Sequence, residues 1–127
     1  MSSKVSNLKV LIVEDNEASE KLLSLLMKAF SNEIFIARTG IQAIDICRKK
    51  TDLDLILMDI GLPELDGYAA TREIRTFNPK VIIISQTANG LTGDFGKSIE
   101  AGCNDYLLKP IQKNKLYAMI NKYFDRT

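Results

Sequence analysis

The sequence predicts a doubly wound α/β domain, in which helices cover both faces of a five-stranded parallel sheet. Short apolar runs without alternation, typical of strands buried on both faces, recur along the chain. Amphipathic stretches of helical length separate these runs, and polar turn residues follow them. Since strand-to-strand crossovers are right-handed, this alternation builds a parallel sheet, for which we expect the strand order 2-1-3-4-5 and five helices.

The chain opens with an apolar strand and an amphipathic helix. The strand runs from Leu8 to Val13 and is interrupted only by Lys9. Asn16 follows it and is suited to cap the helix, because its side chain can accept a hydrogen bond from a free backbone N–H. We expect the helix to turn these apolar residues toward the core: Ala18, Leu22, Leu25, Leu26 and Ala29.

The second strand and helix follow at once. Residues 33–37 form a short apolar strand, and Thr39 with Gln42 has the spacing of a capping box, in which each residue satisfies a backbone N–H at the start of a helix. The residues of this helix expected to face the core are Ile41, Ala43, Ile44 and Cys47.

The apolar run from Leu55 to Met58 is the expected central strand. It ends on a carboxylate, Asp59, and a loop with several turn residues follows. Asp66 is suited to cap the next helix, which we expect to run to about Thr76 and to stop ahead of Pro79. The turn residues of the loop are Gly61, Pro63, Asp66 and Gly67.

The last two strands are also short. The strand at 81–85 ends near Gln86-Thr87-Ala88, and the strand at 105–108 ends on Lys109-Pro110. The helix between them, 92–100, is the weakest, since an interior glycine costs about 1 kcal/mol of helix stability. The glycines in or beside it are Gly90, Gly93 and Gly96, and the final helix is expected to pack Leu116, Ile120 and Tyr123.

Length and composition fit one globular domain, expected at residues 7–124 with flexible ends at 1–6 and 125–127. The 127 residues are 46% hydrophobic and 26% charged, with a net charge of +1, so no general attraction to nucleic acid is expected. No apolar run approaches the ~18 residues of a membrane span, and the N-terminus lacks a signal peptide. Cys47 and Cys103 read as reduced packing residues of a cytoplasmic protein. The chain has no histidine, which rules out acid–base catalysis and metal binding by histidine side chains of this chain.

The polar residues that end the strands are expected to meet at one edge of the sheet. Glu14 and Asp15 end the first strand and Asp59 ends the third, while Thr87 and Lys109 end the fourth and fifth. Three carboxylates repel one another and need a compensating cation. With the lysine the formal charge is −3 + 1 = −2, and oxygen ligands of this charge favour Mg²⁺. The alternative is a set of solvated strand-end acids, with Asp59 capping a turn.

Five motifs stand in or after these strands in a fixed order: Glu14-Asp15; Asp59 with Pro63 and Asp66-Gly67; Thr87-Ala88; Tyr106; and Lys109-Pro110. Together they resemble the receiver domains of two-component response regulators, a family with a flavodoxin-like fold, and the resemblance covers Leu8 to about Phe124. The run from Ala101 to Pro110 is similar above all to receivers attached to hybrid sensor histidine kinases. One variation is Glu14, where many members have Asp.

The resemblance implies a chemistry for each residue. Asp59 would be the phosphoacceptor that takes a phosphoryl group from a phosphohistidine. Mg²⁺ would be bound by Asp15, Asp59, the backbone carbonyl of Gly61 and Glu14, the last directly or through water. Lys109, after which a cis peptide bond to Pro110 is expected, would pair with one phosphoryl oxygen. The hydroxyl of Thr87 and the backbone N–H of Ala88 would bind another.

The resemblance also implies a switch and its partners. Movement of Thr87 toward the phosphoryl group would make room for Tyr106 and change the face formed by the last two helices and the fifth strand. The expected partner is a histidine kinase core or a histidine phosphotransfer protein, with no nucleic acid and no direct membrane contact. A second apolar stripe on the first helix is interpreted as core, with docking of such a partner as the alternative: Leu23, Met27 and Phe30.

As an isolated domain the chain would not be an enzyme beyond phosphorylating and dephosphorylating itself. Its short polar start and abrupt end favour a receiver cut from a hybrid sensor kinase, cytoplasmic or on the cytoplasmic side of a membrane, over a free-standing regulator. The competing interpretations are a flavodoxin-like cofactor-binding domain, which would need a phosphate loop where Glu14-Asp15 stands, and a degenerate receiver-like interaction module. An aspartyl-phosphate phosphatase would typically have a second Asp at the position of Gly61.

Overall fold

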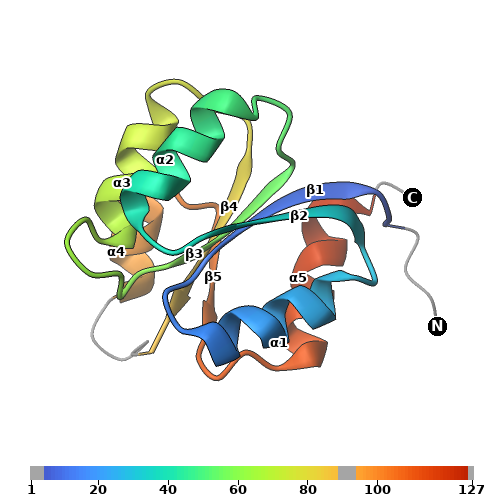
Figure 1. Ribbon diagram of the computed structural model, residues 1–127. Coiled ribbons are helices and arrows are strands. Elements are labelled where there is room, and N and C mark those ends of the chain that lie inside the picture. The colour runs from blue at the N-terminus through green and yellow to red at the C-terminus, as the bar shows by residue number, and fades with distance from the viewer. Residues whose placement is uncertain (1–4, 89–93, 126–127) are drawn as a thin grey trace.

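The computed structural model describes residues 5–88 and 94–125, and in these ranges five parallel strands form one sheet in the order β2-β1-β3-β4-β5. This confirms the predicted topology. Figure 1 shows α2, α3 and α4 on one face of the sheet and α1 and α5 on the other. The strands are β1 (Leu8–Val13), β2 (Ser31–Ala37), β3 (Leu55–Asp59), β4 (Ile82–Thr87) and β5 (Asp105–Leu108). The helices are α1 (Glu17–Met27), α2 (Gly40–Lys49), α3 (Gly67–Arg75), α4 (Asp94–Ala101) and α5 (Lys113–Phe124).

The central strands are apolar at successive positions because both of their faces are buried. In β1, Leu11 and Val13 belong to the core beneath α2, α3 and α4, whereas Val10 and Ile12 belong to the core beneath α1 and α5. All five residues of β3 are buried. Burial on both faces removes the alternation that marks a half-exposed strand, and it places the end of β3 in the middle of the molecule.

Three helices begin at the predicted caps. The side chains of Asn16, Thr39 and Asp66 each accept a hydrogen bond from the backbone N–H three residues on, at 2.9, 3.1 and 2.9 Å. The capping box differs in one respect, because Gln42 Oε1 accepts from the backbone N–H of Arg38 at 2.7 Å, one residue before the cap. These bonds satisfy N–H groups that have no partner within the helix.

The predicted core face of α1 is wrong. Leu22 and Leu25 are 43% and 63% exposed, whereas Leu23 and Met27 are buried. Phe30, just after the helix, is also buried and packs edge-on against Tyr117 of α5, with ring centroids 4.7 Å apart. The helix carries two adjacent apolar stripes, and contact with α5 turns the second one inward. Ala18 and Ala29 are exposed as well, and Leu26 is half-buried.

Docking through the second stripe of α1 is therefore excluded by its burial, and its interpretation as core is confirmed. On α2, Ala43 and Cys47 face the core as predicted, but Ile41 is 61% exposed. Ile41 lies in the first turn of α2, beside rather than on the stripe that Ala43 and Cys47 form.

β4 ends later than expected, whereas β5 spans the predicted residues. β4 continues to Thr87, because Gln86 pairs with Asp59 on one side and Thr87 pairs with Leu108 on the other. The helix predicted at 92–100 corresponds to α4, which is described from Asp94 to Ala101. Thr92, Gly90 and Gly93 lie outside the described residues.

Near the other end of the chain, Val5 is buried in the core beneath α1 and α5. None of the described helices has the length and apolar character needed to cross a membrane.

Candidate functional site

A cleft of about 400 Å³ opens at the edge of the sheet where β1, β3, β4 and β5 end. Since parallel strands share one carboxyl edge, residues far apart in the sequence meet there. The cleft brings together every predicted site residue except Tyr106. Its lining is Glu14, Asp15, Asn16, Ser19, Asp59, Ile60, Gly61, Thr87, Ala88 and Lys109.

Three carboxylates converge in this cleft. One carboxylate oxygen each from Glu14, Asp15 and Asp59 lies within 4.8 Å of the other two. Glu14 is fully buried and Asp59 is 4% exposed, whereas Asp15 is exposed. Backbone N–H groups orient the two buried acids: Asn16 donates to Glu14 Oε2 at 3.2 Å, and Gly61 donates to Asp59 Oδ1 at 3.0 Å. The all-oxygen donor set and its negative charge fit a hard divalent cation.

Among the described residues that line the cleft, Lys109 alone has a positively charged side chain. Its Nζ lies 3.1 Å from Glu14 Oε1 and 3.1 Å from Asp59 Oδ1. The backbone N–H of Lys109 donates to the carbonyl of Thr87 at 2.8 Å, which extends the β4–β5 pairing to the base of the side chain. The peptide bond from Lys109 to Pro110 is cis, as expected.

Burial and proximity shift the protonation of Glu14. Burial, together with the neighbouring Asp59 carboxyl, raises the pKa of Glu14 to about 7, although the hydrogen bond from Lys109 acts in the opposite direction. Burial by itself would lower the pKa of Lys109, but the hydrogen bonds and charges of Glu14 and Asp59 outweigh it and raise that pKa. The negative charge of Glu14 and Asp59 therefore favours a cation in the cleft.

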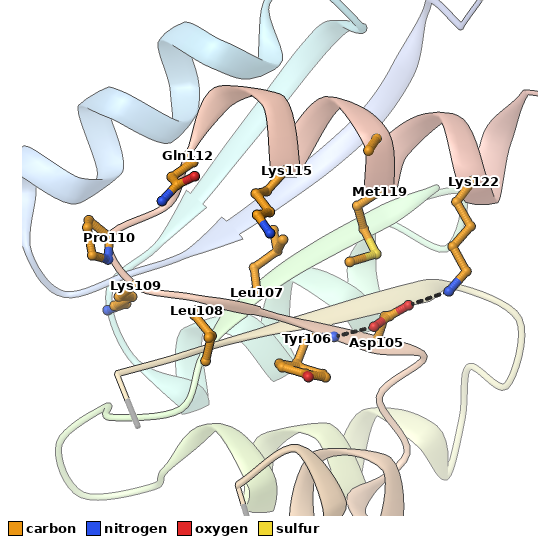
Figure 2. Close-up of a pocket in the computed structure, with 11 residues that line it drawn as sticks. Asp105, Tyr106, Leu107, Leu108, Lys109, Pro110, Gln112, Lys115, Met119 and Lys122 are labelled. Carbon is orange, nitrogen blue, oxygen red and sulfur yellow. Dashed lines mark hydrogen bonds and ion pairs between the residues drawn. The ribbon is translucent and has the colours of Figure 1, made fainter. Parts of the chain in front are cut away.

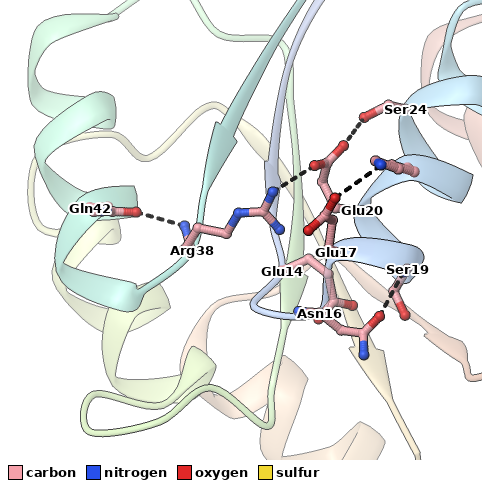
Figure 3. Close-up of polar contacts among 9 residues, drawn as sticks. Glu14, Asn16, Glu17, Ser19, Glu20, Ser24, Arg38 and Gln42 are labelled. Atoms are coloured by element: carbon pink, nitrogen blue, oxygen red, sulfur yellow. Dashed lines mark hydrogen bonds and ion pairs between the residues drawn. The ribbon is translucent and has the colours of Figure 1, made fainter.

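A polar network fixes the start of α1 beside this cleft (Figure 3). Arg38, which directly follows β2, donates to Glu20 Oε1 at 2.8 Å, and Ser24 Oγ donates to Glu20 Oε2 at 2.9 Å. These contacts tie the first turn of α1 to the end of β2, and thereby hold the turn that carries Glu14 and Asp15. The pair could not be predicted from the sequence, since only the β1–β2 pairing brings Glu20 and Arg38 together.

The loop after Asp59 depends on the glycine that opens α3. A side chain at Gly67 would place its Cβ 2.3 Å from the backbone carbonyl oxygen of Asp59. The N–H of Gly67 donates to the carbonyl of Ile60 at 3.2 Å, and the N–H of Ile60 donates to that of Gln86 at 3.1 Å. The missing side chain lets the backbone close over the end of β3 and keeps Asp59 against β4.

Thr87 and Tyr106 lie on the same face of neighbouring strands. Tyr106 pairs with Ser85, and Thr87 is two residues further along β4, so their side chains project to the same side. Figure 2 shows Tyr106 and Leu108 on the side of β5 away from α5, whereas Leu107 and Asp105 face α5. Another pocket, of about 620 Å³, is lined by residues of β5, of α5 and of the segment that joins them.

The family of the chain follows from this fold and site. Residues 10–121 match the model of the response regulator receiver domain, so the chain belongs to the receiver domains of two-component signalling. A histidine kinase from Dictyostelium discoideum, hybrid signal transduction histidine kinase I, is 39% identical over 89% of this chain. The transcriptional regulatory protein ZraR of Klebsiella oxytoca is 30% identical over 93% of this chain.

Solved receiver domains have the same fold. The receiver domain of Saccharomyces cerevisiae Ssk1, crystallised with the histidine phosphotransfer protein Ypd1, is 33% identical with a TM-score of 0.86 over 97% of this chain and 92% of that one. The receiver domain of the Pseudomonas aeruginosa sensor histidine kinase PA1611 is 36% identical with a TM-score of 0.84 over 95% of this chain and all of that one. That structure holds a magnesium ion in its active-site cleft.

The curated relatives are much longer than this chain. It spans 7% of the Dictyostelium kinase and 26% of ZraR. The comparisons confirm the predicted family, the flavodoxin-like fold and a place in a two-component phosphorelay, which the hybrid kinases and response regulators among the relatives share.

Proposed function

We propose that this receiver domain accepts a phosphoryl group on Asp59 from a phosphohistidine of a partner. The observation that carries the proposal is the placement of Asp59, which ends the central strand in the cleft, with Oδ1 3.1 Å from Lys109 Nζ. Asp59 also has an orienting N–H bond from Gly61. Phosphoryl transfer depends on positioning and charge neutralisation more than on acid–base groups, and the cleft offers both.

In the proposed step, a carboxylate oxygen of Asp59 attacks phosphorus while the bond from phosphorus to the histidine nitrogen breaks. The P–O bond forms, and the electron pair of the broken bond stays on the imidazole, which is then neutral after proton uptake. Lys109 would exchange its contact with Asp59 for one with a phosphoryl oxygen. The Thr87 hydroxyl and the Ala88 N–H would bind a further oxygen; both residues line the cleft.

We also propose that Mg²⁺ binds to Asp15, Asp59, the backbone carbonyl of Gly61 and Glu14. The proximity of the three carboxylates supports this assignment. When bound, such an ion neutralises charge on the phosphoryl oxygens. Asp15, the exposed member, is suited to be a direct ligand, whereas the buried Glu14 already bonds Lys109 and the N–H of Asn16.

The phosphoryl group would act through Thr87 and Tyr106. Its added charge of about −1.5 to −2 can draw a neighbouring hydroxyl toward it. Because Thr87 and Tyr106 share one face of β4 and β5, a shift of the first changes the space beside the second. The altered surface would be the one made by α4, β5 and α5, part of which Figure 2 shows.

A histidine kinase core or a histidine phosphotransfer protein is the proposed partner, since the chain itself has no histidine. The likeness to the Ssk1 receiver crystallised with Ypd1 supports a phosphotransfer protein. We further propose that residues 7–124 are the receiver unit of a longer hybrid kinase in the cytoplasm, because hybrid kinases are among the relatives. The isolated domain would be a phosphoacceptor without further enzymatic activity.

Intact-mass measurement after incubation with acetyl phosphate and Mg²⁺ tests the phosphoacceptor. The parent protein should gain the mass of one phosphoryl group, and Asp59→Asn should not. Asp66→Asn is the matched control, since Asp66 caps α3 outside the cleft lining and its loss should leave labelling intact. Equal labelling of the Asp59 variant would refute the assignment.

A further inference from the structure

The fifth strand ends the sheet, and a concave site runs along its open edge. β5 pairs with β4 on one side, and no strand of the described residues lies on its other side. The pocket of about 620 Å³ lies between β5 and one stripe of α5 (Figure 2), and none of its lining residues belongs to β4. The pocket therefore follows the open edge of β5. The α5 wall consists of Lys115, Ala118, Met119 and Lys122.

The backbone of Leu108 is directed toward this open edge. Successive N–H groups of a strand point to opposite sides, and the N–H of Lys109 donates to the carbonyl of Thr87 in β4. The N–H and carbonyl of Leu108 therefore point away from β4, as do those of Tyr106. The side chain of Leu108 is 52% exposed. Backbone groups directed outward from an edge strand are the groups to which an added strand bonds.

A carboxylate already covers one end of this edge. Asp105 Oδ1 accepts from the outward N–H of Tyr106 at 2.9 Å, and Asp105 Oδ2 accepts from Lys122 Nζ at 2.9 Å. The side chain of Asp105 thus takes the position that a backbone carbonyl of a further strand would have at Tyr106. An added segment would bond the other end of the edge, at Leu108.

The charge of the pocket favours an acidic segment. The lining contains three lysines and one aspartate, Asp105, which is already paired with Lys122. Lys109 contacts the carboxylates of the cleft. Lys115 is exposed, and in the described part of the chain no carboxylate forms an ion pair with its Nζ. A second copy of the chain is a poor occupant, because pairing of two β5 edges would bring the lysines of both copies together.

We propose that the pocket between β5 and α5 binds an extended acidic segment of a partner protein, which adds to the sheet at Leu108. The backbone of the segment bonds the N–H and carbonyl of Leu108, an acidic side chain pairs with Lys115, and an apolar side chain packs on Met119. Such binding requires no phosphorylation of Asp59 and is measured in the unphosphorylated protein. Its failure would therefore leave the proposed phosphoacceptor unaffected.

The probe is an acetylated and amidated peptide of about six residues in which glutamate and valine alternate, long enough to lie along β5. In nuclear magnetic resonance titrations of the isotope-labelled protein, this peptide should shift the amide signal of Leu108 in a saturable way. It should also slow hydrogen exchange at that amide. The same peptide with all of its backbone amides methylated keeps its charge but cannot pair as a strand, and it should bind about tenfold more weakly.

Variants test the charge of the pocket. Lys115→Glu reverses one charge of the α5 wall and should weaken binding of the unmethylated peptide about fivefold. Lys80→Glu is the matched control, because Lys80 is also exposed but lies outside the pocket lining, and it should bind as the parent does. Equal affinity of the parent for the two peptides, or equal effects of the two substitutions, would overturn the proposal. Leu108 shifts that depend on protein concentration and not on the peptide would also overturn it, since a second copy would then occupy the edge.

Discussion

Lys109 and Asp59 form an ion pair of 3.1 Å although β4 separates their strands in the sheet. The lysine side chain reaches across the end of β4 and also contacts Glu14, at the end of β1. One cation thus compensates two buried carboxylates from different strands. Removal of one partner from a buried ion pair leaves charge without compensation, which is strongly unfavourable.

Lys109→Met should therefore lower the free energy of unfolding of the metal-free protein by about 3 kcal/mol. Methionine keeps much of the length of the side chain and loses only the charge and its hydrogen bonds. Urea denaturation with a chelator present measures the loss, and saturating Mg²⁺ should reduce it. Lys122→Met, which breaks the exposed pair with Asp105, is the control and should change the free energy by no more than about 1 kcal/mol. Equal effects of the two substitutions would contradict the compensating role of Lys109.

The raised pKa of Glu14 should make the free energy of unfolding of the metal-free protein depend on pH. Its pKa is raised from 4.5 to about 7 in the folded protein, mainly by burial. The folded state therefore binds more protons than the unfolded state in this window, and stability should fall as the pH rises from about 4.5 to about 7. A shift of this size corresponds to about 3 kcal/mol.

Thermal unfolding with a chelator across this pH window tests the dependence. Glu14→Gln should flatten the curve, and Mg²⁺ should do so as well, since a cation favours the ionised carboxylates. If the melting temperatures of the parent and of Glu14→Gln changed with pH in parallel, another group would be responsible.

Gly67→Ala should destabilise the fold and disturb the Asp59 loop. The new Cβ would meet the Asp59 carbonyl oxygen at 2.3 Å, so the backbone must move, and a loss of about 2 kcal/mol or more is expected. Gly96→Ala is the matched control on α4, because in the described part of the chain nothing beyond its own stretch of helix lies within 4 Å of its Cβ position. That change should stabilise the protein by about 0.5–1 kcal/mol through helix propensity. Denaturation midpoints report both, and destabilisation by both substitutions would refute the role of space at Gly67.

Thr87→Ala should leave phosphorylation of Asp59 possible and uncouple it from Tyr106. The threonine would supply a hydroxyl to the phosphorylated state and no charge to the transfer step. Amide chemical shifts near Tyr106 on addition of beryllofluoride and Mg²⁺ measure the coupling, which should shrink in Thr87→Ala and persist in Thr87→Ser. Shift changes of parental size in the alanine variant would show that the signal takes another route.

The topology and the strand-end site were predictable because each depends on local patterns. Burial of β1 and β3 on both faces places apolar residues at successive positions, and a parallel sheet brings the strand-end residues to one edge. Glu14, Asp59 and Lys109 could thus be grouped without knowledge of any distance. The two hydrogen bonds of Lys109, by contrast, depend on side-chain reach across β4, which no sequence pattern encodes.

The inward face of α1 was not predictable from its own sequence. Leu22 and Leu25 fit helical spacing as well as Leu23 and Met27 do, and the choice is made by Phe30 and its contact with Tyr117. The end of β4 was predicted too early for a similar reason. Gln86 and Thr87 are polar, but pairing with Asp59 and Leu108 extends the strand through them.

The cleft is formed by the ends of four strands, so a ligand that contacts all of them binds only when these strands are folded together. A ligand held by Asp15, Asp59 and Lys109 has no site in an unfolded chain, so its binding energy adds to the stability of the entire sheet. At a concentration 100 times its dissociation constant, such a ligand contributes about 2.7 kcal/mol. Detachment of β5 alone would remove Lys109, the positive charge that faces Asp59 and Glu14. Phosphorylation of Asp59, as proposed, would therefore be expected to require that the last strand is in place.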